Sequence, residues 1–142
     1  PVHAEMDRYY FGVWAWASGV RGCSHWAYID AGHRLSYIYP DPDEGPIPTV
    51  GWEAVREGID DYRYLMMLDT LVDRAAADNE TARQARAWLD ELRAGVDLTF
   101  FHGISIGTRV DGPFCYPAPK LESEDYDRIR ANLATSLPDY FA

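Results

Sequence analysis

The chain has 142 residues, of which 47% are hydrophobic, and this is enough for one domain with its own core. Its 23 acidic and 13 basic residues give a formal net charge of −10, which argues against nucleic acid and anionic membrane surfaces as partners. No apolar run approaches the roughly 18 residues that a membrane-spanning helix needs, so we expect no membrane insertion.

The first third of the chain is predicted to hold a helix and two strands. Apolar residues recur at helical spacing from Met6 to Ala17, and Gly19 is well placed to end that helix. The stretch RGCSHWAYID follows, and residues 22–29 within it are apolar on both faces of an extended chain. A second strand is predicted at residues 35–39. Strands without a polar face are typical of parallel sheets covered on both sides, so both need neighbours that this chain does not supply.

The rest of the chain is predicted to be mainly helical. Residues 40–48 read as a proline-rich loop, and a long helix is expected over residues 52–77. A second helix is expected between Asp78 and Gly95, and a last one between Ser123 and Leu137. We therefore divide the chain into residues 1–77, which hold both strands and the long helix, and a helical C-terminal extension at residues 78–142.

Four motifs within residues 8–71 together resemble a known family. They are the turn at residues 19–22, W-x-Y at residues 26–28, Y-P at residues 39–40, and WEAVREGIDDYRYL at residues 52–65. This pattern is similar to the C-terminal end of an uncharacterised bacterial family of glycoside-hydrolase-like proteins, related to glycoside hydrolase family 123, the β-N-acetylgalactosaminidases. Trp52 departs from the pattern, because the family usually has arginine there.

The resemblance implies an α/β fold, namely the C-terminal portion of a TIM (β/α)8 barrel followed by additional helices. Residues 22–29 and 35–39 would be its last two strands, and residues 52–77 its closing helix. The family's catalytic Asp–Glu pair lies on an earlier strand and has no counterpart here. The resemblance therefore implies that the rest of the barrel lies upstream in the same protein, and that this chain is inactive by itself.

Candidate carbohydrate-binding residues lie at the end of the first predicted strand. Trp26, Tyr28 and Asp30 share one strand face near its C-terminal end, where barrel enzymes meet their substrates. Flat aromatic rings suit the apolar face of a sugar, and a carboxylate accepts hydrogen bonds from its hydroxyls. His33, in the loop that follows, could reach the same place. The alternative is that Trp26 and Tyr28 fill the core.

A second group of residues suggests a structural role. Glu53, Arg56, Asp60 and Arg63 are spaced three or four residues apart on the long helix, where opposite charges can pair. We interpret them as a structural clamp that holds the helix to its neighbours, and on that basis Arg56→Ala should destabilise the fold more than Arg86→Ala. No metal-ligand spacing and no phosphate-binding loop occur, so neither a metal nor a cofactor is expected.

The leading hypothesis is a C-terminal segment of a glycoside-hydrolase-like protein that acts on or binds carbohydrate such as N-acetylhexosaminides. Whether the whole protein is an enzyme stays open, as does its localisation. One alternative is a non-catalytic carbohydrate-binding or structural module without hydrolase activity. Another is a small independent helical domain.

Overall fold

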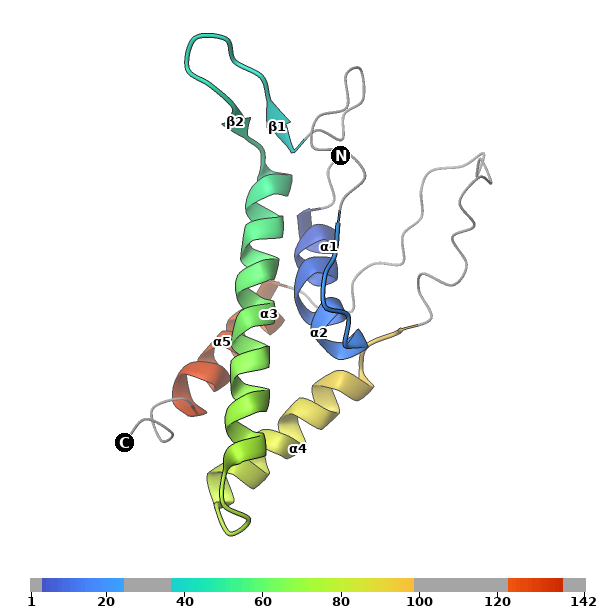
Figure 1. Ribbon diagram of the computed structural model, residues 1–142, viewed down its shortest axis with the longest axis vertical. Helices are drawn as coiled ribbons and strands as arrows, with labels where there is room; N and C mark the ends of the chain where they lie inside the picture. Colours follow the sequence, from blue (N-terminus) through green and yellow to red (C-terminus); the bar gives the residue numbers. More distant parts are fainter. Residues whose placement is uncertain (1–3, 25–36, 99–122, 137–142) are drawn as a thin grey trace.

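The computed structural model describes residues 4–24, 37–98 and 123–136, and this part of the chain is mainly helical (Figure 1). Its elements are α1 (Ala4–Tyr9), the π-helical turn η1 (Tyr10–Trp14), α2 (Ala15–Ser18), β1 (Ile38–Tyr39), β2 (Ile47–Pro48), α3 (Val50–Arg74), α4 (Glu80–Ala94) and α5 (Ser123–Ser136). The 25-residue helix α3 is the central element, and α1, η1, α2, α4 and α5 all contact it.

The helix predicted from Met6 to Ala17 is confirmed as the continuous run of α1, η1 and α2. Its apolar side packs on α3, and Val13 and Trp16 are almost fully buried there. The run ends at Gly19, whose φ of 71° lies in the left-handed region that favours glycine. The backbone N–H of Gly19 donates to the carbonyl of Trp16 at 3.2 Å and closes the last turn.

The long helix α3 follows a capping residue, Thr49. The Thr49 hydroxyl oxygen accepts a hydrogen bond from the Trp52 backbone N–H at 3.3 Å, which satisfies one free donor of the first turn. One stripe along α3 is buried at spacings of three and four residues, as in a core-facing helix: Gly51, Ala54, Gly58, Asp61, Leu65, Leu68 and Val72. Met66 and Met67 lie outside this stripe and are exposed.

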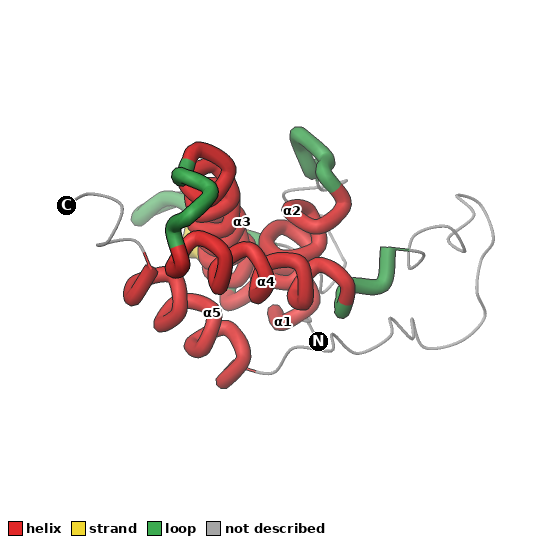
Figure 2. The backbone as a smooth tube through the Cα atoms, turned by 90° about the horizontal axis from the view of Figure 1, so that it is seen from below, coloured by secondary structure: helices red, strands yellow, loops and turns green. Residues whose placement is uncertain are grey.

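The two C-terminal helices cover different parts of α3, as the view along it shows (Figure 2). The Asn79 side chain accepts from the Ala82 backbone N–H at 2.9 Å and caps α4, whose Leu89 is fully buried. Helix α5 contributes Tyr126 and Ile129, which are 1% and 3% exposed. Helix α4 lies where the sequence predicts it, and α5 begins at the predicted Ser123, while the predicted end of the last helix at Leu137 lies outside the described residues.

The predicted α/β fold is wrong, because the described residues form no portion of a TIM barrel. A barrel strand lies between parallel neighbours, whereas β1 and β2 form a two-stranded antiparallel hairpin in which Ile38 pairs with Pro48 and Tyr39 with Ile47. Of the strand expected at residues 35–39, Ile38–Tyr39 is a strand, residue 37 is not, and residues 35–36 lie outside the described residues. Of the strand expected at residues 22–29, residues 22–24 have no regular structure and the others lie outside the described residues.

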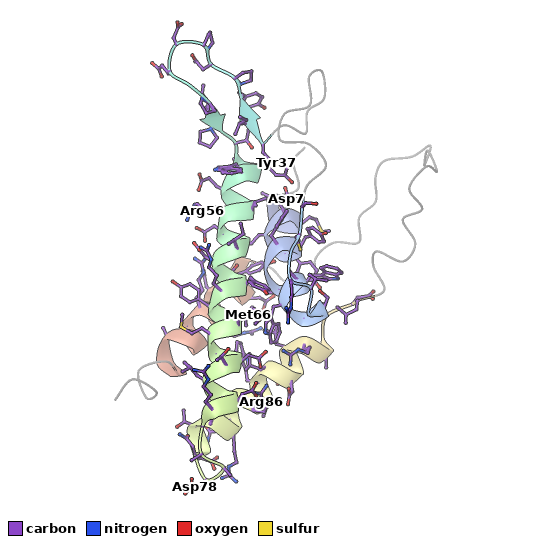
Figure 3. All side chains as sticks on the ribbon, in the orientation of Figure 1. Asp7, Tyr37, Arg56, Met66, Asp78 and Arg86 are labelled. Carbon is purple, nitrogen blue, oxygen red and sulfur yellow. The ribbon has the colours of Figure 1, made fainter. Side chains whose placement is uncertain are left out.

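Local contacts explain why this apolar segment builds no larger sheet in the described part of the chain. Tyr37 is buried against the first helix, where its hydroxyl donates to an Asp7 carboxylate oxygen at 2.8 Å (Figure 3). The Asp41 side chain accepts from the backbone N–H groups of Asp43 and Glu44, which turns the chain back toward β2. The apolar residues of this segment, which suggest a sheet covered on both sides, are thus buried by helices. The partner of Ile38 in the hairpin is Pro48, only ten residues away.

Candidate functional site

The most buried acidic side chain that the structure describes is Asp61, on the inner face of α3, and it is 1% exposed. Arg8 of α1 donates to both of its oxygens, from Nε at 2.7 Å and from Nη2 at 3.2 Å. Arg130 of α5 donates from Nε at 3.0 Å. One carboxylate therefore joins three helices, and two guanidinium groups compensate the cost of its burial.

Two further contacts complete this Asp61 cluster, which we define as Arg8, Glu57, Asp61, Tyr126 and Arg130. Arg130 also donates through Nη2 to Glu57, one turn before Asp61, and this hydrogen bond holds the pKa of Glu57 below its usual value. Burial tends to lower the pKa of Arg130, but its hydrogen bonds with Glu57 and Asp61 together outweigh burial and raise that pKa. The guanidinium carbon of Arg8 lies 4.1 Å from the centre of the Tyr126 ring, a cation–π contact between α1 and α5.

The backbones of α1 and α3 approach closely beside this cluster. A Cβ atom placed on Gly58 would lie 2.6 Å from the carbonyl oxygen of Arg8, so only glycine fits there. Gly12, in the π-helical turn, faces Gly58 in a similar way. Because these glycines let the two backbones approach closely, the side chain of Arg8 can reach Asp61.

A second carboxylate on α3 joins another set of helices. Asp69 accepts hydrogen bonds from the indole of Trp16 at 3.1 Å and from Arg86 and Arg93, each at 2.7 Å. Burial opposes ionisation of Asp69, but the two arginines and the indole more than offset it, and its pKa is lowered. Arg93 also lies over the Trp16 ring, 4.2 Å from its centre. We call these four residues the Asp69 cluster, and it joins α2, α3 and α4.

The residues predicted to form a clamp lie elsewhere on α3. Arg56 contacts Glu53 at 2.8 Å and Asp60 at 3.5 Å, and Arg63 contacts Asp60 at 3.3 Å. These ion pairs all run along α3 itself, and the Arg56 side chain is 55% exposed, pointing away from α1 (Figure 3). Among the described residues, the ion pairs that cross between helices are instead those of Glu57, Asp61, Asp69 and Asp73.

A signal for Asp61 is present in the sequence. It continues the spacing of Ala54, Gly58, Leu65 and Leu68, so it is an acidic residue within an otherwise apolar, core-facing stripe. A charge at such a position needs a partner in the core. Asp60, one residue earlier, has the same side chain on an exposed face, and helical phase alone separates the two roles.

The candidate carbohydrate-binding residues Trp26, Tyr28, Asp30 and His33 all lie outside the described residues. The structure contains a pocket of about 160 Å³ between the first helical run and α3, and some of its lining residues directly precede this segment in the sequence. Phe11, Ile59 and Tyr62 are among its apolar walls, and Arg21 and Cys23 also line it. Burial raises the pKa of the Cys23 thiol, while a hydrogen bond with Tyr10 partly offsets that rise.

The described part of the chain contains neither a metal-binding cluster nor a membrane-spanning helix. Within residues 4–24, 37–98 and 123–136, no group of three or more His, Cys, Asp or Glu side chains is arranged to hold a metal ion. None of the helices in these ranges combines the length and the apolar character needed to cross a membrane. The clusters that these residues do form are ion pairs with arginine.

Comparisons of the chain with protein-family models, with curated proteins and with solved structures found no match.

Proposed function

We propose that this chain is a non-catalytic helical module of a carbohydrate-active, glycoside-hydrolase-like protein. One observation carries the non-catalytic part of the proposal. In the sequence WEAVREGIDDYRYL, the longest family-like motif, Gly58 packs against the Arg8 backbone, and Glu57 and Asp61 form hydrogen bonds with arginines of other helices. The glycine and the carboxylates that make this motif distinctive are therefore used to pack helices together.

The environment of these carboxylates disfavours glycosidic acid catalysis. A general acid must hold its proton near neutral pH, which for Glu or Asp requires a raised pKa. Arg130 lowers the pKa of Glu57, the opposite direction. Asp61 is 1% exposed and accepts from two arginines, so a sugar oxygen has no access to it. Both residues fit an architectural role better than a catalytic one.

The carbohydrate part of the proposal rests on the sequence resemblance of residues 8–71. Sugar contact by Trp26, Tyr28, Asp30 and His33 is inferred from their shared strand face and their place at the strand end and in the following loop, and it stays a prediction. If Trp26 is such a contact, Trp26→Ala should weaken sugar binding by about 1–3 kcal/mol and leave the stability of the helices almost unchanged. If Trp26 is a core residue, the same change should cost about 3–5 kcal/mol of stability instead.

A second candidate function is a segment of an active enzyme for N-acetylhexosaminides, and the same motif resemblance favours it. In that case the Asp–Glu pair that orients the acetamido group and protonates the leaving oxygen belongs to another part of the protein. The two candidates make the same statement about this chain alone, which is that it lacks catalytic activity.

An activity assay tests the proposal. The chain should not hydrolyse aryl N-acetylhexosaminides or aryl hexosides above the rate in buffer. Turnover that is lost in Glu57→Gln would contradict a non-catalytic role, because that variant removes an acid and keeps its size. Binding of free N-acetylgalactosamine and N-acetylglucosamine is measured separately by calorimetry. If the chain is folded but binds neither sugar, the carbohydrate part of the proposal is contradicted and only the structural role is left.

A further inference from the structure

The pocket between the first helical run and α3 combines an apolar interior with a positively charged rim. Phe11 of η1 and Ile59 and Tyr62 of α3 supply the apolar walls, and Arg21 lies in the segment that leaves α2. Its volume of about 160 Å³ is well below the roughly 300–1,000 Å³ of pockets that hold cofactors or drug-sized molecules. A single ring or a branched aliphatic group is the size of ligand that such a pocket accommodates.

The charge of Arg21 is the second observation. Most of the described arginines form ion pairs with carboxylates. Arg21, after α2, and Arg74, at the end of α3, are the two described arginines that form none. In a chain of net charge −10, an arginine that is not paired with an acid at the edge of an apolar pocket is available to an anionic ligand. Because burial raises the pKa of the Cys23 thiol, that residue stays neutral and adds no competing negative charge.

We propose that this pocket binds a small amphipathic carboxylate, with its aromatic or branched aliphatic body between Phe11, Ile59 and Tyr62 and its carboxylate on Arg21. A guanidinium can donate two parallel hydrogen bonds to a carboxylate, which fixes the orientation of the ligand as well as its charge. The same chemistry is offered by a free organic acid and by the C-terminal residue of a peptide. Neither source involves the sugar contacts proposed above, so this inference stands apart from them.

Phenylacetate is the probe that tests the proposal, and phenylacetamide is its neutral control of the same shape. Titration is followed by the amide NMR signals of the chain. Phenylacetate should bind saturably and shift the signals of residues 11, 21–23, 59 and 62, whereas phenylacetamide should bind more weakly. Arg21→Gln should weaken phenylacetate binding by about fivefold, the size expected for a partly exposed ion pair.

Arg74→Gln is the matched variant, because Arg74 also forms no ion pair in the described part of the chain but does not line the pocket. It should bind phenylacetate as the unchanged chain does. Equal affinities for acid and amide, equal effects of the two arginine variants, or no saturable binding would each overturn the proposal. A tripeptide Ala-Ala-Phe with a free C-terminus and its amidated form distinguish the sources: tighter binding of the free peptide than of phenylacetate identifies a chain terminus, and weaker binding identifies a free acid.

Discussion

At the scale of single residues, glycine and charge positions on α3 have roles that their neighbours do not share. The Cα of Gly58 lies against the backbone of Arg8, and the carboxylate of Asp61 lies between two guanidinium groups. Such roles depend on which face of the helix a residue occupies. Spacing along the sequence predicts the i,i+3 and i,i+4 pairs of Arg56 correctly, but only the position of α1 and α5 decides which carboxylates are buried.

Gly58→Ala tests the close approach of α1 and α3. On helix propensity alone the change should stabilise α3 by up to about 1 kcal/mol. The added Cβ would lie 2.6 Å from the Arg8 carbonyl oxygen, however, and backbone cannot move away as a flexible side chain can. We expect net destabilisation of about 1–3 kcal/mol, measured by urea unfolding. Gly22→Ala is the control, because nothing lies within 4 Å of the Cβ position there and stability should hardly change. A more stable Gly58→Ala variant would contradict the packing.

Comparison of two arginines tests which ion pairs matter. The clamp interpretation expects Arg56→Ala to be the more destabilising change, and the geometry favours the opposite order. Arg86 crosses from α4 to Asp69 and Asp73, and its side chain is 31% exposed, whereas the pairs of Arg56 stay within α3 and face solvent. Arg86→Ala should cost about 1–2 kcal/mol, because it leaves a half-buried carboxylate short of a donor. Arg56→Ala should have little effect. Equal shifts of the urea midpoint would contradict this order.

At the scale of elements, the helices could be predicted from the sequence and the strands could not. Helix periodicity, the caps Thr49 and Asn79, and the stops at Gly19 and Gly95 are local signals, and each lies within two or three residues of the observed boundary. A strand is completed by a partner that the local sequence does not specify. Tyr37 and Ile38 are buried as expected, but by a helix and a hairpin rather than by a sheet.

The link between α1, α3 and α5 is tested by two adjacent aspartates. Asp61→Asn removes the charge from the side chain that accepts hydrogen bonds from Arg8 and Arg130, so that Arg8 faces a neutral amide and Arg130 keeps only Glu57 as a charged partner. Removing one charged partner of a buried ion pair lowers the free energy of unfolding by about 3–5 kcal/mol. Asp60→Asn makes the same chemical change one residue earlier, where the pairs with Arg56 and Arg63 are exposed, and should cost much less. Similar melting temperatures for the two variants would argue against the Asp61 cluster as a structural link.

At the scale of the whole molecule, α3 organises the described fold through one face. Its apolar residues build the core with Val13, Trp16, Leu89 and Tyr126, and its two inward carboxylates are placed eight residues apart, at Asp61 and Asp69. Each carboxylate joins a different set of helices to α3. This arrangement explains why the dense charge of the sequence WEAVREGIDDYRYL is compatible with a buried helix: its inner acids meet arginines from other helices, and its outer acids pair along the helix surface.

Stability toward acid follows from the same arrangement. In the folded chain a hydrogen bond from Arg130 lowers the pKa of Glu57, and hydrogen bonds from Arg86, Arg93 and Trp16 lower that of Asp69 against the effect of burial. In the unfolded chain these groups return to about 4.3 and 3.9. At pH values between the folded and the unfolded pKa, the unfolded state binds more protons. The stabilisation from these two carboxylates is therefore fully present above about pH 5 and is lost as the pH falls further.

The double variant Glu57→Gln, Asp69→Asn tests this linkage. It should be less stable than the unchanged chain near neutral pH, because Arg130, Arg86 and Arg93 each lose one of their charged partners. Its stability should also fall less between neutral pH and about pH 3, because two of the groups that take up protons on unfolding are gone. Urea midpoints from far-UV circular dichroism, at constant ionic strength, measure both effects. Asp43→Asn, in the exposed hairpin turn, is the control and should keep the full acid sensitivity. The same fall in midpoint for the double variant and the unchanged chain would place the acid-sensitive groups outside the two clusters.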